Sequence, residues 1–437
     1  MQATERTIFA LATGAGRAAI AIIRLSGPAC GVILDRLCRS KRPVARQATL
    51  RQLWLSDDLL DQALVLWFPG PRSYTGEDGA ELHLHAGAAV IEAVADALVL
   101  LGAYPAEPGE FTQRAFMHGR LDLIEAEGIA DLIEAETQAQ RRQALRQTEG
   151  VLSTLYNDWA GRLRIVLAQQ EALIDFPDED LPPEVETGLL RELGSLAAAM
   201  ATHLAAGGPG ERLRRGLVFA VIGRPNVGKS SLVNALAQRD AAIVSAVAGT
   251  TRDALEIRVI LGDVPVTLVD TAGLRETQDE VEAEGVRRAR HHAGQADLVV
   301  RITEAGSDPE EAPEEINPEE INNVLVVCNK IDQAPAPPGT IGVSARTGAG
   351  LDTLVGILAR HAQELTARSG NAPLTRARHR AGINDAAAHL ALAIGAHWPE
   401  IRGEELRLAM QALGRLTGAV GVEDLLDTVF GQFCIGK

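Results

Sequence analysis

The sequence lacks features that would assign it to several well-defined classes. It contains only four cysteines in 437 residues, and their wide spacing offers neither a zinc-binding pattern nor a disulfide framework. Their positions are Cys30, Cys38, Cys328 and Cys434. No apolar stretch has the length that a membrane-spanning helix requires, and Glu5 and Arg6 precede only a short apolar run. We therefore expect a soluble, cytoplasmic protein with no membrane partner.

Basic residues are also fewer than acidic residues. Lysine and arginine total 42 against 58 aspartates and glutamates, which gives a formal net charge of -16. Such an acidic surface argues against broad electrostatic attachment to nucleic acid, because the phosphate backbone repels it. Arginine clusters at residues 141–146, 287–290 and 376–380 could bind phosphate locally, but solvated helix faces produce the same pattern more often.

The periodicity of apolar residues changes along the chain. Residues 1–118 mix β-rich runs with turn clusters, whereas residues 121–173 place leucines and other apolar residues at spacings of three, four and seven, which indicates long amphipathic helices. Closely spaced prolines at residues 175–183 end these helices. From residue 217 apolar runs alternate with helical stretches in a doubly wound α/β pattern, and after residue 372 the chain is helical again.

These patterns predict a multidomain α/β protein with an α+β N-terminal domain, a helical domain and an inserted Ras-like P-loop G domain. The expected bounds are 1–118 for the N-terminal domain, 119–213 and 371–437 for the two helical parts, and 214–370 for the G domain. Two separate helical domains would produce the same sequence pattern as one helical domain with an insertion.

A phosphate-binding loop follows the predicted strand at 217–222. Residues 223–230 read G-R-P-N-V-G-K-S and precede an apolar-periodic helix, which is the context that this motif requires. Glycines allow backbone N–H groups to surround phosphates, and the helix N-terminus favours negative charge. We expect Lys229 to reach the terminal phosphates and Ser230 to ligate Mg²⁺.

Three further elements follow in the order of a guanine-nucleotide site. D-T-A-G at residues 270–273 ends a strand, where a carboxylate can hold the Mg²⁺ shell. N-K-I-D at residues 329–332 ends another strand, and its aspartate can accept both N–H groups of guanine, which selects GTP over ATP. S-A-R at residues 344–346 supplies a loop over the base, and the hydroxyls of G-T-T-R-D at residues 249–253 belong to a predicted switch loop, with Thr251 as a second Mg²⁺ ligand.

The expected GTP contacts come from these segments and from the switch loop. They are Asn226, Val227, Gly228, Lys229, Ser230, Ser231, Ser245, Ala246, Val247, Ala248, Gly249, Thr250, Thr251, Asp270, Thr271, Ala272, Gly273, Asn329, Lys330, Asp332, Ser344, Ala345 and Arg346.

The hydrolytic residues depart from the Ras pattern, in which a glutamine after the D-x-x-G glycine orients the attacking water. That position is Leu274 here, and an apolar side chain cannot position water. The acidic stretch at residues 279–284 offers replacements, although a solvated first helical turn would also be acidic.

The whole chain resembles the MnmE family of tRNA-modification GTPases, also called TrmE. The resemblance is carried by Y-T-G-E-D at 74–78, P-G-E-F-T-Q-R-A-F at 108–116, L-D-L at 121–123, residues 127–135 and F-C-I-G-K at 433–437, together with the GTPase motifs. It implies a folate-binding N-terminal domain that also dimerises. It further implies work with a FAD-containing partner of the MnmG (GidA) type, in a heterotetramer or larger assembly, to add an aminomethyl or carboxymethylaminomethyl group to C5 of the tRNA wobble uridine.

The resemblance also implies K⁺-activated hydrolysis when two G domains dimerise across their nucleotide faces. Asn226 matches the K⁺-ligating asparagine, and residues 245–250 match the segment that completes that site. The implied K⁺ ligands are Asn226, Ser245, Val247 and Thr250. Glu282 aligns with the glutamate that orients the attacking water, so the implied catalytic set is Glu282, Asn226 and Lys229.

For the reduced folate, of the 5,10-methylene- or 5-formyl-tetrahydrofolate type, the resemblance points to Arg24, Glu81, Arg120 and Lys437. A pterin ring suits a carboxylate partner and a glutamate tail suits cations. Cys434 is fourth from the last residue, but Gly436 and Lys437 do not suit prenylation. A buried apolar cysteine is one explanation for Cys434, and proximity to the folate site, which the resemblance suggests, is the other.

A regulatory or ribosome-assembly GTPase would use the same G motifs and is the alternative function. Such a factor would be expected to carry a basic RNA-binding module, whereas this chain flanks its G motifs with the N-terminal and C-terminal family segments.

Overall fold

The computed structural model divides the chain into two compact units. It describes residues 6–14, 16–175, 183–224, 226–239, 255–270, 294, 296–306, 323–367, 372–421, 426, 429–431, 433 and 435–436. Unit 1 comprises Met1–Ala130, Arg146–Leu193 and Ala388–Lys437, and unit 2 comprises Asp131–Leu145 and Gly194–Ala387. The predicted domain bounds at residues 118, 213 and 370 stay a prediction.

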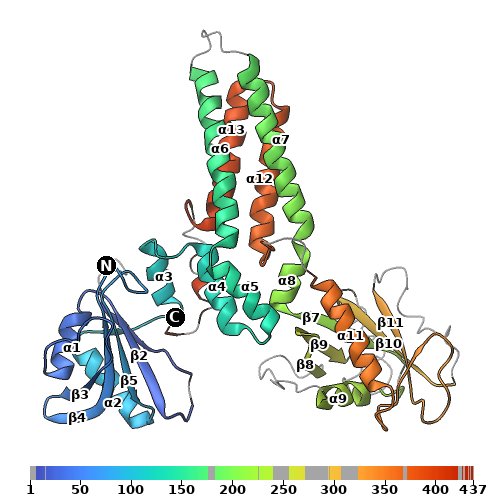
Figure 1. Cartoon of the computed structure of the whole chain (residues 1–437), viewed down its shortest axis with the longest axis horizontal. Helices are drawn as coiled ribbons and strands as arrows, with labels where there is room; N and C mark the ends of the chain where they lie inside the picture. The colour runs from blue at the N-terminus through green and yellow to red at the C-terminus, as the bar shows by residue number, and fades with distance from the viewer. Residues whose placement is uncertain are drawn as a thin grey trace, which may run out of the picture. The chain divides into compact units, whose positions relative to one another are not determined.

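Unit 1 begins with a six-stranded sheet in the order β3-β4-β5-β2-β1-β6 (Figure 1). Its strands are β1 Ile8–Leu11, β2 Ile20–Ser26, β3 Thr49–Leu55, β4 Asp58–Phe68, β5 Gly79–His85 and β6 Tyr104–Pro105. All neighbouring strands are antiparallel except β1 and β6, which are parallel. These strands confirm the β-rich runs predicted within residues 1–118.

Helices α1 (Cys30–Cys38) and α2 (Ala88–Leu100) contribute to the core on one face of this sheet. Because successive strand residues point to opposite faces, Ile23 and Leu25 of β2 join this core, whereas Arg24 points to the other face. The alternation therefore places Arg24 and its neighbour Glu81 of β5 on the face opposite the helices.

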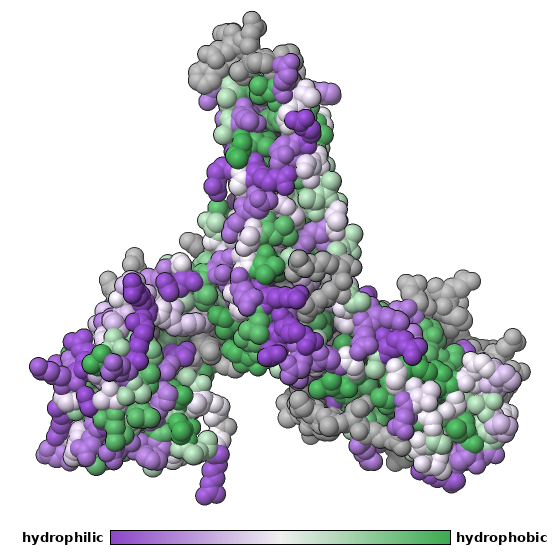
Figure 2. All heavy atoms as spheres, in the orientation of Figure 1, coloured by the Kyte–Doolittle hydropathy of each residue, from purple (hydrophilic) through white to green (hydrophobic). Residues whose placement is uncertain are grey.

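Helices make up most of the middle and last segments, and those within residues 121–173 and after residue 372 confirm the predicted helical stretches. They are α3 Glu110–Met117, α4 Leu123–Glu134, α5 Gln138–Thr148, α6 Val151–Asp175, α7 Pro183–Ala206, α8 Gly208–Arg215, α12 Ala377–Gly395 and α13 Pro399–Thr417. Within unit 1, α6 packs along α13 and buries the predicted apolar positions Leu152, Trp159 and Leu163. Figure 2 shows polar and apolar residues interspersed on the visible face of these long helices. Within the described ranges, no helix combines the length and apolarity needed to cross a bilayer.

Unit 2 contains a second six-stranded sheet, in the order β12-β11-β10-β7-β9-β8. Its elements are β7 Leu217–Ile222, α9 Lys229–Arg239, β8 Leu255–Leu261, β9 Val264–Asp270, β10 Leu298–Glu304, β11 Val324–Asn329, β12 Ile341–Gly342 and α11 Leu351–Leu365. Every neighbouring pair is parallel except β8 and β9. The predicted α/β pattern is confirmed, and the carboxyl ends of β7, β9 and β11 carry the predicted nucleotide motifs.

Candidate nucleotide site and N-terminal cavity

The phosphate-binding loop passes very close to a neighbouring strand. Gly223 follows β7 with φ of +153°, and a Cβ atom there would lie 2.4 Å from the carbonyl oxygen of Ile302 on β10. Since backbone cannot yield as a flexible side chain does, only glycine fits this position. The first glycine of the motif is therefore required by the packing of the sheet as well as by phosphate binding.

Lys229 and Ser230 occupy the first turn of α9, at the end of the loop. The Nζ of Lys229 donates to the carbonyl oxygens of Gly223 at 2.7 Å and Arg224 at 2.9 Å. Burial lowers the pKa of Lys229, and the nearby Asp270 carboxylate opposes that shift. A buried ammonium that donates to backbone carbonyls can exchange these partners for phosphate oxygens.

Asp270 ends β9 directly beside β7 and accepts a hydrogen bond from the hydroxyl of Ser230. The structure therefore brings together three of the predicted site residues, Lys229, Ser230 and Asp270. A hydroxyl and a carboxylate are oxygen ligands of the kind that Mg²⁺ takes when it also binds nucleotide phosphates and water. Within the described ranges no three His, Cys, Asp or Glu side chains gather as a metal site.

Asn329 connects the phosphate loop to the predicted base loop. Its Nδ2 donates to the carbonyl oxygen of Val227 at 2.9 Å, and its Oδ1 accepts the N–H of Ala345 at 3.1 Å. A Cβ atom on Gly228 would lie 2.5 Å from Nδ2, so the second motif glycine makes room for this side chain. Sequence reasoning placed Asn329 among the nucleotide contacts but missed this bridging role.

Asp332 is held as an ionised acceptor. The hydroxyl of Ser344 donates to its Oδ1 at 2.7 Å, and Arg346 Nη2 lies 2.7 Å from its Oδ2. The hydrogen bond from Ser344 lowers the pKa of Asp332, and the charge of Arg346 acts in the same direction. Lys330 forms an ion pair with Glu304 at 2.8 Å. The predicted residues of the N-K-I-D and S-A-R motifs thus meet at one end of β11.

Several predicted contacts lie outside the described residues. Asn226 is described and is exposed, with a positive φ of 64°. The predicted residues outside the described ranges are Ser245, Ala246, Val247, Ala248, Gly249, Thr250, Thr251, Thr271, Ala272, Gly273 and Glu282, together with Cys434 and Lys437.

A cavity of about 240 Å³ lies in unit 1 and contains two of the predicted folate residues. Arg24 donates to Oε1 of Glu81 through Nε at 3.1 Å and Nη2 at 2.9 Å. Its guanidinium also lies 5.6 Å from the centre of the Tyr74 ring. Phe68 and Phe111 complete an aromatic lining that the sequence did not predict.

A buried ionic cluster supports one wall of this cavity. Arg114, 1% exposed, lies 3.1 Å from Glu77 and 2.8 Å from Glu110. Ser26, which lines the cavity, donates to Glu77 at 2.7 Å and is 2.6 Å from the hydroxyl of Thr75. The segments 74–78 and 108–116 are therefore joined by paired charges.

Arg120 is exposed and is not among the residues that line the cavity. A Cβ atom on Gly76 would be 3.5 Å from its Cγ, so its stem lies beside the loop that follows the lining residues Tyr74 and Thr75. The described part of the chain thus places Arg24 and Glu81 together and Arg120 next to their supporting loop.

Two family models match this chain. A family model described as the N-terminus of the GTP-binding protein TrmE matches residues 7–120, and one described as the MnmE helical domain matches residues 123–434. The chain belongs to the MnmE family of tRNA modification GTPases. The MnmE fold class of an α+β N-terminal domain, a helical domain and a Ras-like G domain applies to it, and it is a GTP hydrolase of that family.

The relatives match over their full length. A protein of Gluconacetobacter diazotrophicus is 67% identical over 100% of both chains, and one of Granulibacter bethesdensis is 54% identical over 99% of this chain and 100% of its own. A third, from Rhodospirillum rubrum, is 50% identical over 99% of this chain and 100% of its own. All three are named tRNA modification GTPase MnmE.

Proposed function

We propose that this chain is the GTP-hydrolysing subunit of an enzyme that modifies C5 of the tRNA wobble uridine. It would act with a FAD-containing MnmG-type partner and take a one-carbon unit from a reduced folate to build an aminomethyl or carboxymethylaminomethyl group. The observation that carries the proposal is that one chain places its guanine-nucleotide motifs at the ends of parallel strands in unit 2 and holds a charged cavity with aromatic walls in unit 1. The names of the relatives support the tRNA substrate.

At the nucleotide site, Lys229 would exchange the carbonyls of Gly223 and Arg224 for the β- and γ-phosphate oxygens. The carboxylate of Asp332 would accept the two N–H groups on the guanine edge. Ser230 and Asp270 would hold the Mg²⁺ that accompanies the nucleotide, and that ion would offset the charge on the phosphates.

Asn226 supports the proposal of activation by K⁺. It lies inside the phosphate loop, and its exposed carboxamide can supply an oxygen to a monovalent cation beside the phosphates. We expect GTP turnover in KCl to exceed turnover in NaCl at equal ionic strength, and the difference to shrink in Asn226→Ala. Equal rates in the two salts would exclude the cation role.

Glu282, which lies outside the described residues, is proposed to orient the attacking water because Leu274 cannot. Glu282→Ala is expected to bind GTP with unchanged affinity and to lose most of its hydrolysis. A normal turnover number would show that a different group positions the water.

The cavity beside Arg24 and Glu81 fits a folate in its chemistry. Glu81 offers a carboxylate for pterin N–H groups, Arg24 offers a cation, and Tyr74, Phe68 and Phe111 offer apolar walls. A titration with 5-formyl-tetrahydrofolate tests the site, with weakened binding expected in Arg24→Ala. Binding that is absent in the wild type, or unchanged in the variant, would reject the assignment.

The partners are tested in cells. Co-purification with a flavin protein and loss of the wobble-uridine modification in a strain without this chain are the expected results, and a homodimer is expected in solution. Normal wobble uridines combined with defective ribosomal subunits would favour the assembly-GTPase alternative.

A further inference from the structure

The turn between β8 and β9 is a two-residue hairpin turn that contacts α11 within unit 2. Gly262 and Asp263 both have positive φ, of 60° and 68°, which is the two-residue turn that continues the twist of a hairpin. A Cβ atom on Gly262 would lie 3.0 Å from the carbonyl oxygen of Ala359, and Gln363 donates to the Gly262 carbonyl at 3.1 Å. The tip of the hairpin is therefore packed against α11.

Asp263 extends from this tip to the start of α5. Its Oδ1 accepts the backbone N–H of Gln138, the first residue of α5, at 2.9 Å. Its Oδ2 lies 2.9 Å from Nη2 of Arg142, one helical turn further along. The first amides of a helix have no partner inside the helix. The hydroxyl of Thr137 accepts the N–H of Gln140 at 3.2 Å as a local N-cap, and Asp263 accepts the amide of Gln138 from 125 residues away.

A second ion pair joins the same two segments. Arg258 of β8 lies 2.9 Å from Glu136, two residues before the start of α5. We call these five residues, Asp263, Gln138, Arg142, Arg258 and Glu136, the α5 latch. The latch joins the β8–β9 hairpin to residues 131–145, and all of its members belong to unit 2.

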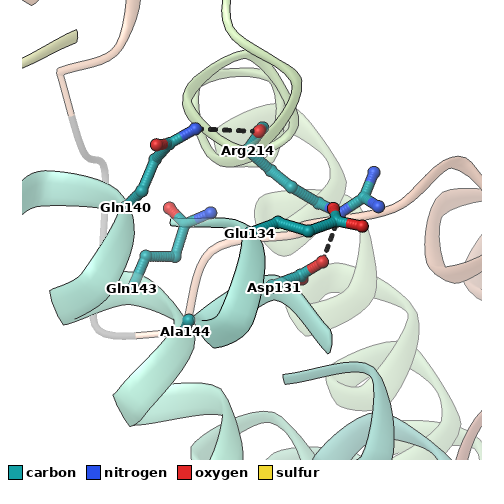
Figure 3. Close-up of a pocket in the computed structure, with 6 residues that line it drawn as sticks. All are labelled: Asp131, Glu134, Gln140, Gln143, Ala144 and Arg214. Carbon is teal, nitrogen blue, oxygen red and sulfur yellow. Dashed lines mark hydrogen bonds and ion pairs between the residues drawn. The ribbon is translucent and has the colours of Figure 1, made fainter. Parts of the chain in front are cut away.

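The segment that carries the latch is also fixed at its opposite side, around a cavity of about 20 Å³ (Figure 3). Oδ1 of Asp131 forms ion pairs with Nε of Arg214 at 2.8 Å and with Nη2 of Arg376 at 2.6 Å. Gln140 donates to the carbonyl of Arg214 at 3.1 Å, and Gln143 donates to that of Gly210. Arg214 lies just before β7 and Arg376 just before α12, so residues 131–145 hold the chain where it enters and leaves the G domain.

The other end of the hairpin is part of the nucleotide site. β9 ends at Asp270, which accepts the hydroxyl of Ser230, and β8 is the edge strand that pairs with β9 alone. The two strands pair in register from Leu255 and Asp270 down to Leu261 and Val264. A paired strand does not stretch, so a displacement of Asp270 by nucleotide or Mg²⁺ is carried along β9 to the turn.

We propose that the α5 latch couples the state of the bound nucleotide to the start of α5, with Asp263 as the positioning residue. GTP and GDP place different charge beside Ser230 and Asp270, so they favour different positions of β9 and hence of Asp263. Each position of Asp263 changes its hydrogen bond to Gln138 and its ion pair with Arg142. The stability of the first turns of α5 then depends on which nucleotide is bound. The inference rests on nucleotide binding at this site and not on K⁺, folate or tRNA.

Hydrogen exchange on the full chain tests the coupling without any substitution. Amides of residues 138–145 are compared with saturating GDP and with a non-hydrolysable GTP analogue. A cap of about 1 kcal/mol corresponds to a change of about fivefold in exchange, and we expect a difference of that size between the two states. Equal exchange in both states would overturn the inference. A wild-type chain that bound neither nucleotide would contradict the proposed function.

Variants separate coupling from a merely structural cap. Asp263→Ala removes both contacts, and Asp263→Asn keeps an acceptor for Gln138 and tolerates the positive φ but loses the charge opposite Arg142. The matched control is Glu171→Gln, which removes a partner of Arg407 in an ion pair of 2.7 Å with similar exposure, 48% and 34% against 54% and 38%.

The expected result is that Asp263→Ala reduces the nucleotide-dependent difference at residues 138–145 to less than about twofold, because the acceptor for Gln138 and the partner of Arg142 are gone in both states. Asp263→Asn retains part of the difference, Glu171→Gln retains all of it, and every variant binds the GTP analogue normally. A difference that persists at full size in Asp263→Ala would overturn the coupling. Loss of nucleotide binding in that variant would also overturn it, because the defect would then lie in the site.

Discussion

The nucleotide site and the N-terminal cavity are held together by different kinds of contact. At the nucleotide site, Lys229 and Asn329 bond to backbone carbonyls of the loop that they support. In the cavity, Arg24 pairs with Glu81 over 57 residues of sequence, and side chains make the decisive contacts. The loop is a local backbone structure, whereas the cavity depends on the register of strands. The phosphate loop itself is therefore recognisable from one contiguous motif, although Asn329 reaches it from 102 residues away. The pairing of Arg24 with Glu81 is not contained in any contiguous motif.

The largest expected effect is a loss of stability at the buried ion pairs that support the cavity. Arg114→Leu leaves Glu77 and Glu110 without their cation, and removing one member of a buried ion pair costs about 3–5 kcal/mol. The free energy of opening of β2 and β5, measured by amide exchange, should fall by that amount. The control is Arg407→Leu at an exposed ion pair, for which we expect a loss of stability of under about 1 kcal/mol. Equal losses in the two variants would contradict the role of burial.

The next effect is expected at the phosphate loop. Lys229→Ala removes the cation that would meet the terminal phosphates, and loss of such a group lowers turnover by about 10²- to 10³-fold. Steady-state GTP hydrolysis measures this. The sheet of unit 2 should stay intact, because β7 and α9 keep their apolar core contacts. Turnover within threefold of wild type would mean that Lys229 does not reach the phosphates.

A smaller effect, on the affinity for GTP, is expected at Asp332, the predicted partner of the guanine base. Asp332→Asn exchanges a charged acceptor for a carboxamide, and hydrogen bonds to charged groups contribute about 1.5–3 kcal/mol, so GTP should bind about 10- to 100-fold more weakly. Xanthosine triphosphate should gain relative to GTP, because the new NH₂ group can donate to the oxygen that xanthine has in place of the guanine amino group. An unchanged preference would place base recognition elsewhere.

The smallest effect is expected at one wall of the cavity. Tyr74→Phe removes the 2.8 Å hydrogen bond to Thr112 but keeps the ring beside Arg24. A neutral hydrogen bond contributes about 1 kcal/mol, so binding of the reduced folate should weaken about fivefold at most. A calorimetric titration checks this, and a loss as large as that in Arg24→Ala would show that the hydroxyl contacts the ligand itself.

Sequence reasoning reached the nucleotide site because residues 223–230, Asp270 and Asp332 belong to short motifs at the ends of strands. It did not reach Asp263 or Arg114. Asp263 accepts a helix amide that is 125 residues away in the sequence, and Arg114 pairs with Glu77, which is 37 residues away. Such pairs depend on which segments the fold places side by side, and the local pattern of one sequence does not contain that information. The cation ligands of residues 245–250 and the role of Glu282 stay predictions.

We propose that one chain carries two separate sites, one for GTP in unit 2 and one for a reduced folate in unit 1. The binding of both ligands to the wild type, Lys229→Ala and Arg24→Ala, measured by calorimetry, tests this directly. We expect the wild type to bind both ligands and each variant to lose affinity only for its own ligand. A wild type that does not bind the folate, or an Arg24→Ala variant that loses GTP as strongly as Lys229→Ala does, would contradict it.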